Sequence, residues 1–267
     1  MTEIMYKNRP WLANNLLSTC LAMVLVCIAP LARGVDPAAS APLHLTLARQ
    51  LLENVAPSHN EYRHTEQISL PSDRVSKGFA MYADCSGLAI ALLDRAASPA
   101  RSLMAVQKPR QRPLAEDFVH SIQGAHGFQQ ITNIERIQPG DLIAWKFTLD
   151  SDKKIAKDTG HVMLIDTIPV KIENRAPFVP NTTQYELFVI DSSRSYHDPH
   201  DTRVQADGSK IKGLGRGKLR LYVSADNEIV GFANNFTNAM FQPFDSAWAQ
   251  YSTGKSKIGS IGRPLYH

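Results

Sequence analysis

Cysteine is scarce in this chain, and its scarcity restricts the available chemistry. Three cysteines occur in 267 residues, and two of them, Cys20 and Cys27, lie inside an apolar N-terminal segment. If that segment is removed on export, Cys85 is the single thiol of the mature chain. A single thiol cannot form an internal disulfide. The sequence therefore excludes a disulfide-stabilised scaffold and leaves Cys85 to be explained in another way.

The chain also lacks a strong excess of charge. Its formal net charge is +4, and without residues 1–34 this falls to about +2, because Lys7, Arg9, Arg33 and Glu3 are lost. So small a charge gives no reason to expect nucleic acid as a partner. Internal repeats and low-complexity blocks are absent from the sequence as well. About 230 residues remain, which suits one substantial core, and we expect a monomer.

The N-terminal segment has the layout of a secretory signal peptide. Lys7 and Arg9 give a positive start, residues 16–32 are almost wholly apolar, and Ala32-Arg33-Gly34 offers small residues for cleavage. We therefore expect residues 1–34 to be a signal peptide and the mature chain to be periplasmic or secreted in a bacterium. The apolar run is near the lower limit for a membrane span, so an uncleaved anchor is the alternative.

The remaining sequence predicts helices first and antiparallel strands afterwards. Hydrophobic periodicity predicts helices over 43–55, 88–97 and 113–121. Alternation and turn residues predict strands over 142–149, 161–168, 185–191, 217–224 and 228–233, the last two as a hairpin. Helices followed by strands indicate an α+β fold rather than alternating βαβ units.

These elements define the expected domain organisation. Residues 35–57 are interpreted as a linker and leading helix, residues 58–251 as the functional domain, and residues 252–267 as a tail. The tail is rich in Gly, Ser and Lys and has few residues able to anchor it.

Cys85 lies at the start of the second helical run, in Tyr82-Ala83-Asp84-Cys85-Ser86-Gly87. A thiol attacks as the thiolate, which the positive end of a helix and a nearby imidazolium both stabilise. Asp84 can cap the helix, and the first amides, including that of Cys85, can donate to an oxyanion. The alternative is that Cys85 is a small buried apolar residue. The polar neighbours Asp84 and Ser86 favour a nucleophile at a surface cleft.

His161 is the best candidate for the base among nine histidines. It opens a predicted strand after Asp158-Thr159-Gly160, and the apolar residues 162–165 behind it would hold it rigidly. An idle, solvated histidine at a strand edge is the alternative. Three other histidines fall in regions expected to be loop or helix surface: His64, His120 and His126.

Asp191 is the candidate for the group that orients this histidine. It ends the predicted strand over 185–191, and antiparallel pairing with the His161 strand would make the two side chains neighbours. A slip of one residue in register would point Asp191 away. The alternative is a solvated aspartate at the start of the Ser192-Ser193 turn.

The order of these motifs resembles the NlpC-type group of papain-like cysteine peptidases. The resemblance spans roughly residues 60–235 and is carried by Asp84-Cys85-Ser86-Gly87, by Pro139-Gly140-Asp141-Leu142-Ile143 and by Gly160-His161-Val162. It implies a papain-like fold, in which a nucleophile helix packs on an antiparallel sheet or partial barrel.

The resemblance also implies roles for particular residues. Cys85 matches the nucleophile, His161 the base and Asp191 the third polar member. In the family an upstream tyrosine helps to form the oxyanion site. Tyr62 is the candidate for this role, and Tyr82 is less favoured because it is so close to the nucleophile. His64 and Ser86 are further candidates for oxyanion or substrate contacts. The chain departs from the family in its Asp third member, in the long separation of that residue from His161, and in lacking a Trp-Gly-Gly-like stretch.

Two other motifs contain residues that could form a site. Tyr196-His197-Asp198-Pro199-His200-Asp201 is rich in possible metal ligands, but Pro199 breaks a helical presentation, so we interpret it as an exposed loop rimming the cleft. Gly213-Leu214-Gly215-Arg216-Gly217 resembles part of a phosphate loop, but a strand follows it where a helix is needed. The basic residues over 210–220 favour a solvated face, or less often a site for anionic polymer. No metal or cofactor is expected.

The sequence therefore predicts an exported thiol hydrolase that cleaves an amide bond. The resemblance implies a bacterial peptidoglycan stem peptide as substrate, often cut at γ-D-glutamyl bonds in the family. A membrane contact is expected only if the N-terminal segment is uncleaved. Two alternatives stay open. One is an acyltransferase or deamidating effector that acts on a protein, and the other is a non-catalytic cell-wall-binding module with the same fold.

Overall fold

The computed structural model describes residues 41–71, 78–106, 112–148, 159–236, 238–252 and 257–266. The predictions for the signal peptide, for Cys20 and Cys27 and for the linker before residue 41 lie outside these residues. Residues 40–267 form a single compact unit. Among the described residues, none of the helices is long and apolar enough to cross a membrane.

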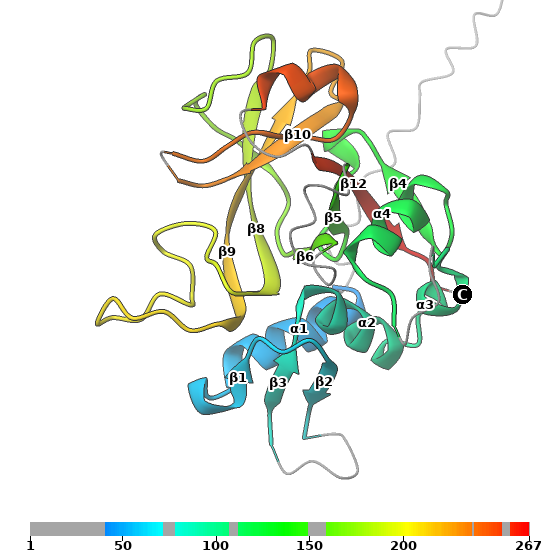
Figure 1. Ribbon diagram of the computed structural model, residues 1–267, viewed down its shortest axis with the longest axis vertical. Helices are drawn as coiled ribbons and strands as arrows, with labels where there is room; N and C mark the ends of the chain where they lie inside the picture. The colour runs from blue at the N-terminus through cyan, green and yellow to red at the C-terminus, as the bar shows by residue number, and fades with distance from the viewer. Residues whose placement is uncertain are drawn as a thin grey trace, which may run out of the picture. The chain divides into compact units, whose positions relative to one another are not determined.

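The helices and strands follow the predicted order, with helices mainly in the first half (Figure 1). The α-helices are α1 (Leu43–Asn54), α2 (Cys85–Arg95), α3 (Ala100–Leu103) and α4 (Ala115–Gln123). Short 3-10 helices cover Pro57–His59, Ile134–Arg136 and Ser246–Tyr251. The strands are β1 (Asn60–Glu61), β2 (Glu66–Ser69), β3 (Ala80–Ala83), β4 (Phe128–Ile131), β5 (Leu142–Phe147), β6 (Gly160–Ile165), β7 (Val170–Lys171), β8 (Thr183–Ser193), β9 (Gly213–Val223), β10 (Ile229–Asn234), β11 (Gln242–Pro243) and β12 (Lys257–Pro264).

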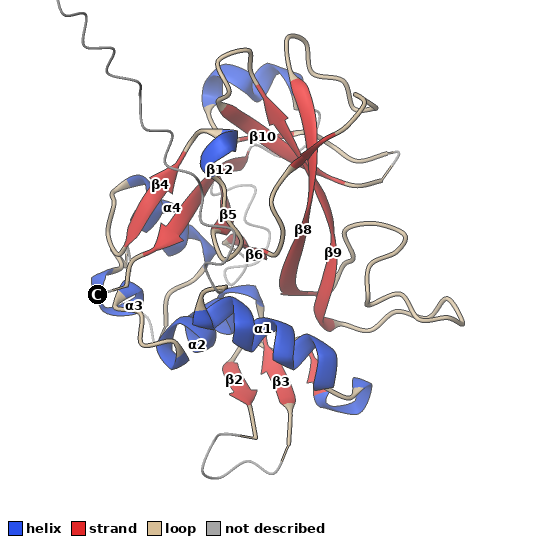
Figure 2. Cartoon of the chain, turned by 180° about the vertical axis from the view of Figure 1, so that it is seen from behind, coloured by secondary structure: helices blue, strands red, loops and turns tan. Residues whose placement is uncertain are grey.

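The larger of two sheets is antiparallel throughout and confirms the α+β class. Within the described residues it has nine strands in the order β11-β10-β9-β8-β6-β5-β12-β4, with β7 paired to β8. A small sheet, β1-β3-β2, occupies the region before Cys85, for which the sequence predicted no strands. Figures 1 and 2 show α1 and α2 side by side between the small sheet and the large one.

The large sheet curls until its β4 end meets β10. The amide of Ile134 donates to the carbonyl of Asn227 over 3.0 Å, and the amide of Ile229 donates to the carbonyl of Thr132 over 2.7 Å. Thr132 and Ile134 follow β4, whereas Asn227 precedes β10 and Ile229 is its first residue, and the two strands are far apart in the strand order. Closing a sheet in this way removes exposed strand edges and creates an interior. The sheet therefore has an inner face that packs on itself and an outer face that the helices cover.

Alternation along the strands supplies a separate core to each face. Leu142 in β5 and Val162 in β6 join the core beneath the α-helices, which includes Leu88 of α2. The next residues along, Ile143 and Met163, belong to the core inside the curled sheet. Successive side chains of a strand point to opposite faces, so one period-2 pattern builds both cores.

The predicted C-terminal tail is wrong, because Lys257–Pro264 forms β12 inside the sheet. This strand pairs with β5 on one side and β4 on the other. Its small residues serve close packing: a Cβ added at Gly262 would lie 2.5 Å from a side-chain carbon of Ile122 in α4. The Gly and Ser content that indicated a loose tail therefore reflects a strand closely covered by a helix.

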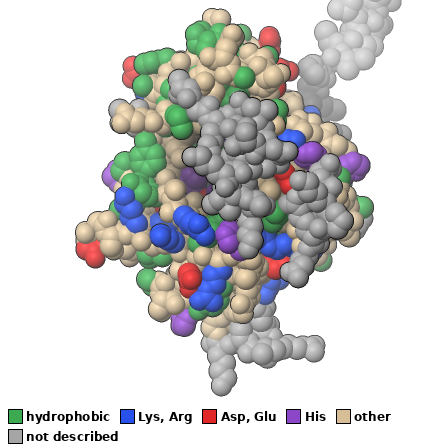
Figure 3. Space-filling view, viewed as in Figure 1, with side chains coloured by type: hydrophobic (Ala, Val, Ile, Leu, Met, Phe, Trp, Pro, Cys, Tyr) green, Lys and Arg blue, Asp and Glu red, His purple; other side chains and the backbone are tan. Residues whose placement is uncertain are grey.

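The basic stretch over 210–220 is not simply a solvated face. The guanidinium Nε of Arg216 lies 2.6 Å from a carboxylate oxygen of Asp166, and the ammonium of Lys218 lies 2.7 Å from Glu186. Arg220 is fully buried and donates to backbone carbonyls. Figure 3 shows Lys and Arg side chains across the lower middle of one face, with acidic side chains among them. Part of the basic charge of this stretch is thus neutralised within the fold.

The position of β12 generates a prediction about stability. Ile261 is 1% exposed in the core inside the curled sheet. Ile261→Ala should lower the free energy of unfolding by about 2–4 kcal/mol, because it removes buried methylenes and leaves a cavity. Urea unfolding followed by circular dichroism measures this. Leu265→Ala, at a position 41% exposed, is the matched control and should change stability by about 0.5 kcal/mol or less. Equal, small effects of both variants would show that the C-terminal segment is unanchored after all.

Candidate active site

Cys85 is the first residue of α2, and Asp84 caps that helix as predicted. The Asp84 carboxylate accepts a hydrogen bond from the Gly87 amide over 2.9 Å. Cys85 is 6% exposed, and residues 85–93 are all buried, which makes α2 a central helix. A helix that begins at the thiol directs the positive end of its dipole and its free amides toward the sulfur.

The Asp84 carboxylate also gathers the other residues predicted near Cys85. Its second oxygen accepts hydrogen bonds from the guanidinium of Arg112 and, over 3.0 Å, from Nδ1 of His64. The Ser86 hydroxyl links Arg112 to Asp84, because it accepts a hydrogen bond from the Arg112 guanidinium over 2.7 Å and donates one to the Asp84 carboxylate over 3.2 Å. Sequence reasoning missed Arg112, whose surroundings in the sequence form no recognisable motif. This cluster fixes the entrance to α2.

Tyr62 and His64 stand at the mouth of the site. The two rings pack edge to face with centroids 5.5 Å apart, and the guanidinium of Arg194 lies 4.8 Å from the Tyr62 centroid. A cavity of about 230 Å³ has both residues, Cys85 and Ser86 in its lining. The structure therefore places all three candidates for oxyanion or substrate contacts, Tyr62, His64 and Ser86, in the cavity that contains the thiol.

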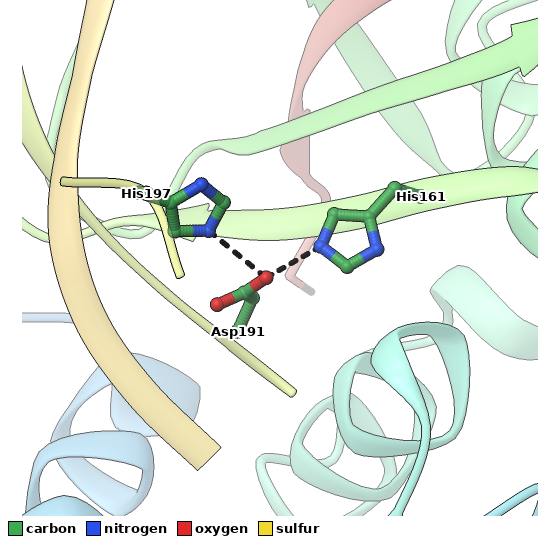
Figure 4. Close-up of side chains that lie close together, drawn as sticks. All are labelled: His161, Asp191 and His197. Atoms are coloured by element: carbon green, nitrogen blue, oxygen red, sulfur yellow. Dashed lines mark hydrogen bonds and ion pairs between the residues drawn. The ribbon is translucent and has the colours of Figure 1, made fainter. Parts of the chain in front are cut away.

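His161 and Asp191 are neighbours, as the predicted strand pairing requires. Strand β6 pairs antiparallel with β8 through Leu164 opposite Ile190. His161 and Asp191 have the same parity as Met163 and Val189, which both face the inner core, so the register points both side chains to one face. Nε2 of His161 lies 2.5 Å from Oδ2 of Asp191 (Figure 4).

His161 and Cys85 line the same cavity, where the start of α2 meets the sheet. Gly160 makes this approach possible, because its φ is +143° and an added Cβ would lie 1.8 Å from the carbonyl oxygen of Trp145. Only glycine fits there, next to β5. The imidazole is thus held between the sulfur on one side and a carboxylate on the other.

The electrostatics of the site favour a charged imidazolium. Burial lowers the pKa of His161, but the charge of Cys85, the hydrogen bonds to Asp191 and Cys85, and the charge of Asp191 outweigh it and raise the pKa to about 10. Burial would raise the pKa of Asp191, yet the charges of Arg203 and His197 and the hydrogen bond from His161 hold it well below its usual range. The site therefore holds a charged imidazolium beside the Cys85 sulfur and a buried carboxylate, the kind of surroundings that stabilise a thiolate.

Two residues that sequence reasoning did not place in the site complete the surroundings of Asp191. Nη1 of Arg203 lies 2.9 Å from Oδ1 of Asp191, and Nε2 of His197 lies 3.0 Å from Oδ2. Figure 4 shows the two imidazoles on opposite sides of the same carboxylate oxygen. Arg203 is in turn held by Asp201, at 2.8 and 2.6 Å.

The prediction that residues 196–201 form an exposed loop is wrong for three of its six residues, although Pro199 and His200 are exposed as expected. His197, Asp198 and Asp201 are buried, because they close over β9 beside Asp191. The sequence signal for the burial of this loop was the set of alternate glycines over 213–217. A Cβ at Gly215 would lie 2.3 Å from the side chain of Arg203, and one at Gly217 would lie 2.4 Å from that of Asp201. Alternate glycines in a strand mark the close approach of other groups.

Comparison with curated proteins finds similarity to the uncharacterized protein R653 of Acanthamoeba polyphaga mimivirus. The two are 32% identical over 201 residues, which cover 72% of this chain and 87% of the viral protein. The chain belongs to the same family as this viral protein. No family model matches the sequence, and no solved structure matches the fold. The name of the mimivirus relative states no activity, so the function of the family is inferred from the site.

The geometry around Asp191 also raises the question of a bound metal ion. One atom each of His161, Asp191 and His197 lie within 4.8 Å of one another, which suits three ligands of a zinc ion. Arg203 already neutralises the same carboxylate, however, and a second cation beside it would be repelled. The 2.5 Å separation of His161 from Asp191 is that of a hydrogen bond, whereas Nε2 of His197, 3.0 Å from the carboxylate, lacks hydrogen-bond geometry and is held as an ion pair. The cluster is better described as a carboxylate with charged and hydrogen-bonding partners.

The raised pKa of His161 generates a prediction. In Cys85→Ala the contribution of the Cys85 side chain is lost, so the pKa of His161 should fall from the value of about 10 to which its neighbours raise it. Ring resonances followed by NMR against pH measure this, with His161→Gln for assignment. Ser102→Ala, at an exposed position outside the cavity, is the matched control. An unchanged titration in Cys85→Ala would show that no thiolate–imidazolium pair exists.

Proposed function

We propose that this protein is a papain-like thiol hydrolase that cleaves an amide bond through Cys85, His161 and Asp191. The observation that carries the proposal is that His161 lines the same cavity as Cys85, at the start of α2, and hydrogen-bonds to Asp191. A nucleophile, a base within hydrogen-bond reach and a third group that orients the base are the components of nucleophilic acyl transfer.

The first half-reaction uses each part of this arrangement. The Cys85 thiolate attacks the amide carbonyl, and negative charge develops on the carbonyl oxygen. The amide of Cys85 lies in the first turn of α2, where backbone amides lack helical acceptors and can donate to that oxygen. His161 then gives its proton to the leaving amine, the C–N bond breaks and a thioester remains on Cys85.

The second half-reaction restores the enzyme. His161, now neutral, accepts a proton from water as the water oxygen attacks the thioester carbonyl. The C–S bond breaks, the acid is released and the thiolate–imidazolium pair forms again. Asp191 keeps Nε2 of His161 protonated throughout, so that the other ring nitrogen carries out both transfers.

The export of the protein and its substrate belong to the same proposal. A bacterial peptidoglycan stem peptide is supported by the sequence resemblance of the Cys85 and His161 motifs, and export by the sequence of residues 1–34. Transfer of the acyl group to an amine of a protein would use the same three residues, and identification of the products separates the two reactions.

Substitution of the three residues tests the proposal. Cys85→Ala should abolish the burst of p-nitrophenolate from p-nitrophenyl acetate, because no thioester can form. His161→Ala should slow the burst almost as much. The loss of burst rate in Asp191→Asn should be roughly a hundredfold smaller than in His161→Ala, because removing a group that orients the base costs less than removing the base itself. Asp245→Asn, at an exposed helix cap, is the matched control and should keep the full burst. A full burst in Cys85→Ala would refute the thiol mechanism and leave a binding module.

A metal-dependent hydrolase is the second candidate, favoured only by the cluster of His161, Asp191 and His197. Dialysis against EDTA distinguishes it. We expect the burst to be unchanged after dialysis and unchanged again on adding Zn²⁺ at a stoichiometric level, because Arg203 occupies the carboxylate. Loss of activity with EDTA and recovery with Zn²⁺ would assign the reaction to the metal cluster instead.

A further inference from the structure

We infer that the leaving-amine side of the substrate binds in a second, larger cavity beyond His161, and that this cavity selects a bulky apolar or aromatic group. The inference rests on the proposed function and adds a class of substrate to it. It concerns the residue on the amine side of the cleaved bond, for which the Cys85 motif gives no information.

Two cavities meet at His161. The smaller one, of about 230 Å³, contains Cys85, and the larger one, of about 780 Å³, does not. Three residues line both of them, Trp145, His161 and Ser193. A substrate that crosses this shared wall passes the thiol first and the imidazole second. The larger volume is within the range of pockets that enclose a drug-sized ligand.

The chemistry fixes which part of the substrate lies on each side. The acyl carbon bonds to the sulfur, so the acyl group belongs in the cavity that contains Cys85. The leaving nitrogen takes its proton from His161, so it must lie within hydrogen-bond reach of that ring. The group attached to this nitrogen then extends past His161, and the larger cavity is the space it meets.

The lining of the larger cavity is suited to an apolar group. Met163 and Phe232 from the inner core form part of it, and aromatic rings of Trp145, Tyr196 and Phe236 form more. The last two pack edge to face at 5.2 Å between centroids. Burial of an apolar side chain among such rings is favourable in proportion to the area removed from water.

The charges around the cavity oppose a cationic leaving group. The ammonium of Lys257 lies 4.0 Å from the centroid of Trp145, and His161 is itself protonated before the amine leaves. No aspartate or glutamate is among the described residues that line the cavity. When it attacks the thioester, a lysine-like amine would meet the like charge of Lys257 there while His161 is neutral, so it should be captured poorly.

Acyl transfer to added amines tests this side of the site without knowledge of the natural acyl group. p-Nitrophenyl acetate acetylates Cys85 and releases p-nitrophenolate. An added amino-acid amide then competes with water: its nitrogen attacks the thioester carbonyl, its proton passes to His161, the C–S bond breaks and an N-acetyl amide is formed. By microscopic reversibility, an amine that attacks well occupies the site of a good leaving group.

The measurement is the ratio of N-acetyl amide to acetate for phenylalaninamide, leucinamide, alaninamide and lysinamide at equal concentrations of free amine. We expect phenylalaninamide and leucinamide to be captured at least about tenfold better than alaninamide, and lysinamide worst. Phe236→Ala and Met240→Ala should each reduce the preference for phenylalaninamide. Met240 lines the cavity and is 48% exposed, so its substitution is tolerated by the fold. Phe178→Ala, 70% exposed and outside the cavity, is the matched control and should leave the preference unchanged.

The outcomes separate the two proposals. A burst with a preference for bulky apolar amines that falls in Phe236→Ala or Met240→Ala supports the inference. A burst with equal capture of all four amides, or with lysinamide preferred, overturns the inference and leaves the proposed function in place. The absence of any burst from the unaltered protein overturns the proposed function, and the inference falls with it.

Discussion

The charge of Asp191 is the feature on which the rest of the site depends. Its carboxylate is completely buried, and removing an ion from water costs several kcal/mol unless partners compensate. Arg203 and the imidazoles of His161 and His197 provide that compensation, and Asp201 in turn compensates the buried Arg203. Each group in this chain of contacts makes the burial of the next one tolerable. Loss of one of these side chains would leave a buried charge without compensation.

This network reaches the thiol through His161, whose ring bonds to Asp191 and lines the cavity that contains Cys85. A negative Asp191 favours a positive His161, and a positive His161 favours a negative sulfur at the start of α2. The helix supplies the remaining stabilisation through Asp84, whose carboxylate holds the first turn in place. The proposed reactive pair, Cys85 and His161, therefore lies where the helical layer meets the curled sheet, and its geometry depends on both.

Local sequence was sufficient for the parts of the site whose geometry is local. The capping of α2 by Asp84 follows from adjacent residues, and the meeting of His161 with Asp191 follows from strand parity once β6 and β8 are taken as partners. Long-range packing decided the rest. Strand β12 has the composition of a flexible tail because its glycines carry no hydrophobic signal, and Arg203 has the sequence context of a surface residue because its partner, Asp191, belongs to another element. Neither the glycines of β12 nor the residues around Arg203 have a hydrophobic periodicity that indicates which side chains pack against them.

His197 connects the larger cavity to the charge network. Its ring lines that cavity, and its Nε2 lies 3.0 Å from the carboxylate that orients His161. Its Nδ1 lies 3.2 Å from the side-chain oxygen of Asn234, which lines the same cavity. A change at His197 would therefore alter both the shape of the cavity and the charge around Asp191. The side chains of Phe236 and Met240 are uncharged and line the cavity, so a change in amine preference caused by them reports on binding, because the charges behind His161 stay intact.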